Sequence, residues 1–292
     1  MQKKIKKKRT GQTVRGFLAA CFLLVPAVAI CLPAALLLSG SITGEYEMYV
    51  RLFPLLRDGE GYVTWSWLPA FPDFSQFGKL LFASPQFFVL FWNSVKITGL
   101  ILAGQLLTAV PAAWAFSRYR FRAGKMLFFI YMILMLLPFQ VMMLSEYLVM
   151  DRTGLLNTHW AVILPAVFST FPVFLIYRSF GGIPESLLEA ARMDGAGEWY
   201  LFFGIGLPLG EGGILSAVVL NFLECWNLIE QPLAFLKDRA LWPLSLYLPN
   251  IGTDQAGFAM AASVITLLPA LCVFLFGQDY LEQGIAASGT KG

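Results

Sequence analysis

The residue types that usually carry out catalysis are scarce in this sequence. Its 292 residues include a single histidine, His159, which stands beside Trp160 at one end of an apolar stretch. A histidine that activates a serine or cysteine also needs a third group to orient it, and one histidine leaves little room for such a set. We therefore interpret His159 as an interfacial residue, at the boundary between apolar and polar surroundings.

The sequence also lacks the motifs that bind metal ions or nucleotide phosphates. No cluster offers the three or four nitrogen, sulfur or oxygen ligands of a zinc site, and no G-x-x-x-x-G-K-[ST] phosphate loop occurs. The cysteines fall singly in apolar stretches without C-x-x-C spacing, which favours small buried hydrophobes: Cys21, Cys31, Cys225 and Cys272. The sequence thus predicts no metal and no cofactor bound by this chain.

Polar residues within apolar stretches are the better candidates for function. The stretch "NFLECWN" places Asn221, Glu224 and Asn227 about one helical turn apart, on adjoining positions of one face. A carboxylate inside a bilayer is costly, so it normally faces a polar cavity or a partner. Two interpretations stay open, a translocation path and a structural hydrogen-bonded seam. Gln140, in an earlier apolar stretch, is a weaker candidate of the same kind.

The elements that must position these residues are membrane helices. The chain is 58% hydrophobic and 13% charged, with a mean hydropathy of +0.67. Roughly 20 residues of helix cross the ~30 Å hydrocarbon core of a bilayer. Five gaps without a charged residue reach that length, and they lie between residues 15 and 45, 96 and 118, 125 and 146, 152 and 178, and 254 and 279.

A sixth span, which is the fifth in chain order, is predicted from about Leu209 to Leu228, although Glu211 and Glu224 interrupt it. Because every backbone amide in lipid must be satisfied within the segment, six such runs predict an all-α six-helix bundle. We expect a basic N-terminus over residues 1–15, a transmembrane domain over 16–278 and a tail over 279–292. The first span is expected to be an uncleaved one, because its apolar run is too long for a signal peptide.

Basic residues predict the orientation of the bundle. With the N-terminus in the cytoplasm, the inner segments hold 14 lysines and arginines and the outer segments seven, so both termini are expected inside. The longest outer interval, about residues 40–86, contains "WSWLPAFPDFSQF". That segment is interpreted either as an interfacial aromatic belt in an irregular loop or as a docking surface for an external partner.

The inner segment over about residues 181–208 has clear helix punctuation. Pro184 suits a first helical position, and Glu185 suits the positive end of the helix dipole. The helix should stop at Gly195, which tolerates the left-handed conformation that a sharp turn needs. A second helix begins near Glu198 and leads into the fifth span, with a kink at Pro208. The pattern predicts a helix-turn-helix elbow.

The same segment resembles the EAA loop of ABC importer permeases. The matching residues, with every spacing kept, are Glu189, Ala190, Ala191, Asp194, Gly195, Ala196, Phe202, Ile205, Leu207 and Pro208. The stretches "NSVKITGLILAGQLLTAVPAAWAFSRYRF", "TGLLNTHWAVILP", "ECWNLIEQPLAFL" and "QGIAASGTKG" are similar to the carbohydrate-uptake branch of the maltose-permease type. The resemblance covers nearly the whole chain and implies a six-span permease of the type I ABC importer kind.

What the resemblance implies about partners is specific. Such a permease, in the bacterial cytoplasmic membrane, pairs with a second homologous permease, two copies of a cytoplasmic P-loop ATPase that uses ATP and Mg, and an extracytoplasmic solute-binding protein. The EAA elbow sits in a cleft of the ATPase, and ATP-driven closure rocks the bundle so that sugar is imported. The chain itself is then no enzyme, and membrane lipid rather than nucleic acid surrounds it.

Three positions differ from the pattern of the family that the chain resembles. Gly212 stands where a proline is usual, Gly204 where a basic residue is common, and Glu224 where a small residue is typical. In the maltose-type arrangement the other permease holds most of the sugar, which leaves this chain's substrate contacts open. A self-sufficient secondary transporter and an intramembrane enzyme are the alternatives, although no internal repeat supports the first and no paired catalytic set the second.

Overall fold

The computed structural model of this chain is helical. It describes the backbone of residues 2–56, 62–63, 66–248, 251 and 255–289, and the side chains of these residues except 2–21, 53, 55, 56 and 282–289. Within those ranges no strand forms, and one isolated bridge joins Thr43 to Pro72. The all-α fold class predicted from the sequence is therefore confirmed. The chain divides into two compact units, residues 1–84 with 251–265, and residues 85–250 with 266–292.

The first unit contains most of the interval predicted as an outer loop. Its helices are α1 (Gln2–Ser41), α2 (Glu45–Leu56), α3 (Ser75–Ala83) and the first part of α14 (Ala256–Gly289). Glu47 ties α2 to the loop that follows it, because its carboxylate accepts from Arg51 and, at 3.1 Å, from the backbone N–H of Ala70. The interval is thus partly helical rather than irregular throughout.

Aromatic side chains of this interval are exposed. Trp67, Phe71 and Phe74 are 59%, 83% and 64% exposed, while Trp65 lies outside the described residues. Both interpretations of "WSWLPAFPDFSQF", the aromatic belt and the docking surface, stay predictions.

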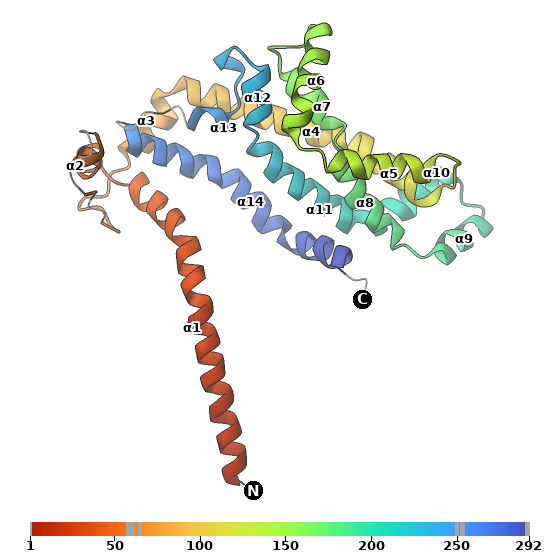
Figure 1. The fold of residues 1–292 in the computed structure, drawn as a ribbon, viewed down its shortest axis with the longest axis horizontal. Coiled ribbons are helices and arrows are strands. Elements are labelled where there is room, and N and C mark those ends of the chain that lie inside the picture. The colour runs from red at the N-terminus through yellow and green to blue at the C-terminus, as the bar shows by residue number, and fades with distance from the viewer. Residues whose placement is uncertain (1, 57–61, 64–65, 249–250, 252–254, 290–292) are drawn as a thin grey trace. The chain divides into compact units, whose positions relative to one another are not determined.

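The second unit begins with one long helix and continues through shorter ones (Figure 1). In chain order its helices are α4 (Pro85–Arg118), α5 (Gly124–Met135), α6 (Phe139–Arg152), α7 (His159–Val167), α8 (Thr170–Gly181), α9 (Glu185–Met193), α10 (Glu198–Tyr200), the π-helical segment η1 (Leu201–Gly206), α11 (Leu207–Trp226), α12 (Glu230–Phe235), the short 3₁₀ turn η2 (Arg239–Leu241) and α13 (Leu244–Tyr247). The later part of α14 belongs to the same unit.

Five helical stretches are long and apolar enough to cross a membrane. They are Phe22–Ser41, Pro85–Arg118, His159–Gly181, Glu198–Trp226 and Ala256–Leu281. A sixth span is obtained if α5 and α6 are taken together, although these two helices are bent by 104° at their junction. Judged by length and composition, the structure therefore contains the six spans that the sequence predicts if α5 and α6 together count as one.

The third predicted span is not one straight helix. The gap between residues 125 and 146 is divided at Pro138, which has an extended conformation (φ −68°, ψ 145°) just before α6 begins. Proline offers no backbone N–H and its ring clashes with the preceding turn, so a proline inside a helix bends or ends it. The expectation of a continuous helix here was wrong.

The second arm of the elbow and the fifth span form one continuous helical stretch. It begins at Glu198, as expected for the helix that leads into the span, and ends at Trp226 instead of Leu228. The N–H of Leu207 bonds to the carbonyl of Phe202, five residues back, which is a π-type bond. The wider π turn accommodates Pro208, so this proline follows a π-helical segment at the point where a kink was expected.

The core of the second unit lies among α4, α8 and α11, which contact one another (Figure 1). Three glycines of α11 and the segment before it make this approach possible. A Cβ added at Gly206 would lie 2.5 Å from the Trp114 ring, and one added at Gly210 would lie 2.3 Å from the Phe180 ring. At Gly213 the added atom would lie 2.2 Å from Ser179. Small residues at such contacts let helix backbones approach closely.

The cysteines differ in their surroundings. Cys225 is buried, whereas Cys31 and Cys272 are exposed on the isolated chain, and the side chain of Cys21 lies outside the described part. Of the three cysteines whose side chains the structure describes, Cys225 alone matches the buried hydrophobe that the sequence predicts. Among the described residues, no group of three or more His, Cys, Asp or Glu side chains could hold a metal ion.

Candidate functional site: a helical elbow

The elbow predicted from the sequence is formed by α9, a tight turn and α10. Helix α9 ends at Met193, and Gly195 adopts φ +86°. The N–H of Gly195 bonds to the carbonyl of Arg192 at 3.0 Å, and the N–H of Ala196 bonds to that of Ala191 at 2.9 Å. These paired bonds define a Schellman motif, in which a residue without a Cβ is favoured at the left-handed position. The predicted stop at Gly195 is thus explained by backbone geometry.

The start of the elbow differs slightly from the prediction. Pro184 lies at the N-cap, with φ −60° and ψ 133°, and Glu185 is the first helical residue. Proline still suits the position, because an N-cap N–H has no partner within the helix. The carboxylate of Glu185 lies in the first turn, where the helix dipole favours a negative charge.

One face of the elbow packs on the core of the unit. Leu188 and Leu201 are fully buried, and Ala191 and Ala196 pack against the same cluster. Phe202 contributes an aromatic contact, with its ring centroid 5.7 Å from that of Trp114. Burying two leucine side chains contributes roughly 3–6 kcal/mol of transfer free energy. The elbow is therefore anchored as part of the folded unit.

The other face of the elbow is exposed. It presents Glu189, Ala190, Asp194 and Gly195 together with Met193, which is 88% exposed. Beyond the turn, Trp199 is 77% exposed, and its ring stacks on Phe203 with centroids 5.9 Å apart. An apolar surface of this kind, mixed with carboxylates, can be covered by a partner.

The residues that carry the EAA resemblance thus divide into two sets. Those that pack inward are Ala191, Ala196, Phe202, Ile205 and Leu207. Those that are exposed are Glu189, Ala190, Asp194, Gly195 and Pro208. The first set attaches the elbow to the unit, and the second set is accessible to a partner.

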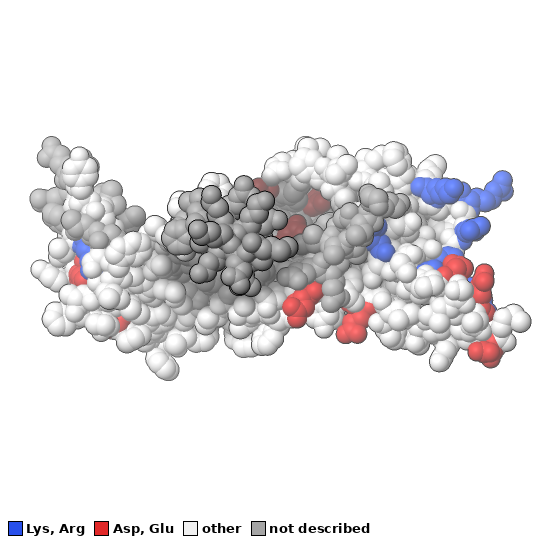
Figure 2. Space-filling model, turned by 90° about the horizontal axis from the view of Figure 1, so that it is seen from below, with Lys and Arg blue, Asp and Glu red and all other residues white. Residues whose placement is uncertain are grey.

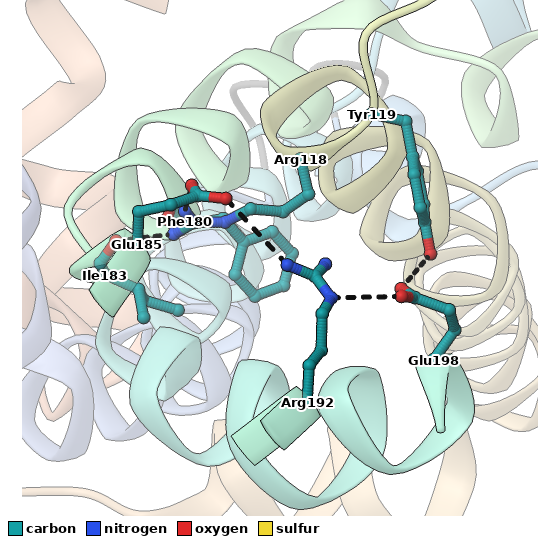
Figure 3. A network of polar contacts seen from close by, with 7 residues as sticks. All are labelled: Arg118, Tyr119, Phe180, Ile183, Glu185, Arg192 and Glu198. Carbon is teal, nitrogen blue, oxygen red and sulfur yellow. Dashed lines mark hydrogen bonds and ion pairs between the residues drawn. The ribbon is translucent and has the colours of Figure 1, made fainter. Parts of the chain in front are cut away.

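Arg118, at the end of α4, fixes the start of the elbow (Figure 3). Its Nη2 donates to the carbonyl of Ile183 at 2.8 Å and to that of Phe180, and its Nη1 lies 3.3 Å from a carboxylate oxygen of Glu185. The guanidinium also lies over the Trp114 ring, 5.7 Å from the centroid. The Arg118 side chain is only 6% exposed, so α4 supplies a buried cation to the junction between α8 and α9.

A second chain of polar contacts fixes the turn of the elbow. Arg192 pairs with Glu198 across the turn at 3.2 Å, and the other oxygen of Glu198 accepts from the Tyr119 hydroxyl at 2.9 Å (Figure 3). Desolvation and the neighbouring carboxylate raise the pKa of Tyr119 above its usual value, so the phenol keeps the proton that it donates. Arg118, the last residue of α4, thus contacts the start of α9, and Tyr119, which follows it, contacts the start of α10.

Basic side chains surround this end of the unit. Figure 2 shows lysines and arginines gathered around the end where α9 and α10 lie. Arg120, Arg122 and Lys125, in the connection between α4 and α5 and at the start of α5, are exposed. Sequence reasoning treated Arg118 as one of these topology-setting charges and missed its buried role, because spacing alone does not tell which of four neighbouring basic residues turns inward.

The end of the unit opposite the elbow is held by side chains of α4 and of the start of α7. Asn93 donates to the carbonyls of Ala240 and Trp242 at 2.7 and 3.1 Å, and Ser94 accepts from the N–H of Leu244 at 2.8 Å. His159 lies with its Nε2 3.1 Å from the carbonyl oxygen of Leu241. The histidine predicted as interfacial therefore has a structural contact at this far end of the unit.

The structure does not bring the proposed path residues to one place. Asn221 is buried and donates to the carbonyl of Ala217 at 2.8 Å, whereas Glu224 is exposed. Asn227, also exposed, follows the last residue of α11 and donates to the carbonyl of Leu223 at 2.9 Å. The three lie one turn apart as predicted, but the buried amide and the exposed carboxylate have different surroundings.

Two residues that sequence reasoning did not single out, Gln105 and Glu230, contact or adjoin these candidates. Gln105 of α4 is buried, donates to the carbonyl of Ala166 at 2.9 Å and lines a small pocket together with Asn221. Gln140 donates to both oxygens of Glu230 in α12, at 2.9 and 2.7 Å. An amide inside an otherwise charge-free gap was the available signal for Gln105. A role of any of these residues in translocation stays a prediction.

A helical fold with five to six candidate spans, and with a helical elbow fixed to its core, indicates a multi-pass membrane protein. Residues 105–287 match the family described as "Binding-protein-dependent transport system inner membrane component". The chain belongs to this family, whose matched region contains the elbow and most of the core around it.

Curated relatives are transport-system permeases rather than enzymes. The arabinooligosaccharides transport system permease protein AraQ of Halalkalibacterium halodurans is 30% identical over 241 residues, which cover 82% of this chain and 85% of that protein. The lactose transport system permease protein LacG of Rhizobium radiobacter is 30% identical, covering 71% of this chain and 77% of its own length. The sn-glycerol-3-phosphate permease UgpE of Yersinia enterocolitica is 27% identical, covering 70% and 75%.

A solved structure has the same fold. A bacterial ABC transporter involved in the import of the acidic polysaccharide alginate matches with a TM-score of 0.77 and 23% identity, covering 91% of this chain and 96% of that chain. The fold of an ABC importer permease, expected from the sequence, is confirmed.

Proposed function

We propose that this chain is a permease subunit of an ATP-driven importer of oligosaccharides or related carbohydrates, and that the elbow couples it to a cytoplasmic ATPase. The observation that carries the coupling is the division of the elbow into an anchored face and an exposed face. Leu188 and Leu201 are buried in the unit, while Glu189, Asp194 and Met193 remain accessible. A partner that pushes on the exposed face would move α4, α8 and α11 with it.

The carbohydrate cargo is supported by the relatives. Permeases named for arabinooligosaccharides and for lactose each share 30% identity with this chain. A relative named for sn-glycerol-3-phosphate shows that related permeases also serve polar solutes that are not sugars. The cargo proposed here is therefore a class, and the solute-binding protein identifies its member.

The proposed assembly contains a second homologous permease, two copies of a P-loop ATPase that binds ATP and Mg, and an extracytoplasmic solute-binding protein. The protein would lie in the bacterial cytoplasmic membrane with both termini and the elbow on the cytoplasmic side. The exposed basic residues at the elbow end, Arg120, Arg122 and Lys125, support this orientation, since lysines and arginines favour the cytoplasmic side. The division into a basic N-terminus (1–15), a transmembrane domain (16–278) and a tail (279–292) stays a prediction. Helix α14 continues through Gly289, beyond the predicted start of the tail.

The composition of the complex is tested by purifying the tagged chain from native membrane in mild detergent and identifying the proteins that co-purify by mass spectrometry. Recovery of a second permease, a P-loop ATPase and a solute-binding protein is expected. Recovery of this chain alone, able to move solute in vesicles without ATP, would replace the proposal with a self-sufficient secondary transporter.

The coupling role of the elbow is tested with a matched pair of glycines. Gly195, in the elbow, and Gly154, after α6 at the far end, both have positive φ, +86° and +68°. An alanine at either position costs roughly 1–2 kcal/mol, because an L-residue is strained in the left-handed conformation. Gly195→Ala should lower ATP-dependent uptake, and Gly154→Ala, which carries the same backbone strain, should leave it near the wild-type rate. Equal losses would show that strain rather than coupling was measured.

The exposed acidic residue provides a second test. Glu189→Ala removes a carboxylate that is exposed on the elbow, and Asp151→Ala removes an exposed carboxylate from α6 at the far end. We expect the first variant to insert into the membrane normally and to lose ATP-dependent uptake. The second variant should keep both properties. Normal transport by Glu189→Ala together with Gly195→Ala would mean that the elbow is not the coupling element.

A further inference from the structure

Helix α4 ends in a residue that is bound to three separate acceptors. The Nη2 of Arg118 donates to the carbonyls of Phe180 and Ile183, at and just beyond the end of α8, and its Nη1 pairs with Glu185 at the start of α9 (Figure 3). The side chain is 6% exposed and lies over Trp114, and its buried Nε has no hydrogen-bond partner in the described part of the chain. Because a buried cation is costly unless it is paired, the acceptors of Nη1 and Nη2 hold this side chain in place.

An arginine fits this geometry. Its Nη2 donates to two carbonyls, of which that of Phe180 also accepts from the N–H of Ile183, while its Nη1 reaches the carboxylate of Glu185. A lysine carries the same charge on a single nitrogen, which can donate to the two carbonyls but cannot also reach Glu185 while a planar group lies over Trp114. The carbonyl bonds are the buried part of the contact, because the Glu185 side chain is 61% exposed.

The opposite end of α4 is bound just as closely. Asn93 and Ser94 make three hydrogen bonds to the backbone of residues 240–244, with donor–acceptor distances of 2.7 to 3.1 Å. Helix α4 has 34 residues, which at 1.5 Å each makes a rod about 50 Å long. One helix therefore contacts the elbow at one end and the 240–244 segment at the other.

We propose that Arg118 is the positioning residue that makes the elbow and α4 move as one body, so that a displacement of the elbow reaches the 240–244 segment at the far end. This inference rests on the proposed coupling function. Without the guanidinium, α9 would still pack through Leu188 and α8 would still pack on α4 through Phe180 and Trp114. The carbonyls of Phe180 and Ile183 would, however, lose the polar contact that fixes the junction between α8 and α9 to the end of α4. A displacement of the elbow by the ATPase would then move α9 without moving α4.

The test uses the full complex with its ATPase and binding protein, reconstituted in lipid. Arg118→Gln removes the cation, and Arg118→Lys keeps the charge without the planar guanidinium. Glu185→Gln removes the exposed carboxylate, which pairs with Arg118 at 3.3 Å and with Arg192 at 4.0 Å. Arg120→Gln is the matched control, because Arg120 is exposed and forms no hydrogen bond or ion pair within the described part of the chain. Three quantities are measured: the ATPase that co-purifies, uptake, and the ratio of binding-protein-stimulated to basal ATP hydrolysis.

We expect Arg118→Gln to lower both uptake and the stimulation ratio by about tenfold, because truncating one partner of a buried hydrogen-bonded charge typically costs enough for such a change. The amount of co-purifying ATPase should stay close to that of the wild type. Arg118→Lys should be intermediate. Glu185→Gln and Arg120→Gln should behave like the wild type, since exposed ion pairs contribute little.

A merely structural role for Arg118 predicts a different pattern. Less complex would then assemble, while uptake and stimulation for each assembled complex would be unchanged, and that result would overturn the inference. If Arg118→Gln does not accumulate in the membrane, the same comparison is made on Arg118→Lys, where an unchanged stimulation ratio overturns it equally. Failure of the wild-type chain to bind any ATPase would instead contradict the proposed function.

Discussion

The contact between Gly210 and Phe180 allows a quantitative prediction about how closely α8 and α11 must pack. A Cβ at Gly210 would lie 2.3 and 2.7 Å from two ring atoms of Phe180, far inside van der Waals contact. The ring cannot move away easily, because Phe180 is fully buried and meets Trp114 edge to face with centroids 5.1 Å apart. Overpacking of this kind costs about 1–3 kcal/mol.

Gly210→Ala should therefore destabilise the protein, and Gly99→Ala is its matched control. Gly99 lies within α4 and is exposed, and a Cβ there would meet nothing within 4 Å. Alanine at such a position stabilises a helix by roughly 0.5–1 kcal/mol relative to glycine. The two identical substitutions are thus predicted to change the free energy of unfolding in opposite directions.

The assay is thermal unfolding of the purified protein in detergent, in which 1 kcal/mol corresponds to about 2–4 °C for 150–250 residues. A double-mutant cycle identifies the clashing partner: in a Phe180→Leu background, the cost of Gly210→Ala should shrink, because the smaller side chain leaves room. If Gly210→Ala is as stable as Gly99→Ala, the close approach of α11 to α8 is refuted. If the cost is the same in both backgrounds, Phe180 is not the residue that clashes.

Three further predictions concern other contacts. Trp114→Leu removes the ring that contacts Phe180 and Arg118, and its loss should destabilise the protein by about 3 kcal/mol and increase proteolysis in the elbow. Asn93→Leu leaves two backbone carbonyls without their donor, and it should destabilise by about 1–3 kcal/mol and expose residues 240–244 to faster hydrogen exchange. The Lys79 side chain hydrogen-bonds Glu45 and lowers the pKa of that carboxyl below 4.5, so the pair is lost as the pH falls through that lowered value. Lys79→Ala should raise the Glu45 pKa, as measured by infrared or NMR titration.

The sequence was most informative where the identity of one residue restricts the backbone. Gly195 was predicted to end a helix because few other residues adopt a positive φ easily, and the turn forms there. The all-α class followed from charge-free gaps whose length matches a bilayer. These inferences needed no knowledge of which side chains meet in space.

Features that depend on contacts between distant segments could not be read from the sequence. Arg118 looked like a topology-setting charge, and only the position of α8 shows that it satisfies carbonyls there. Pro138 was visible, but prolines also occur within α4 and α14, at Pro111 and Pro269, where the helix continues. Whether a proline bends a helix or breaks it depends on what satisfies the freed backbone groups, and that is decided by tertiary packing.

The break between α5 and α6 has a consequence for biogenesis. The two arms have 12 and 14 residues, about 18 and 21 Å of helix, so neither alone crosses a ~30 Å hydrocarbon core. Polar side chains of the second arm find partners in α12: Gln140 bonds to Glu230, 90 residues later, and Gln231 donates to Glu146, 85 residues earlier. A nascent chain that has not yet reached α12 lacks those partners. We therefore expect this segment to reach its final arrangement only late in synthesis, after α12 has emerged.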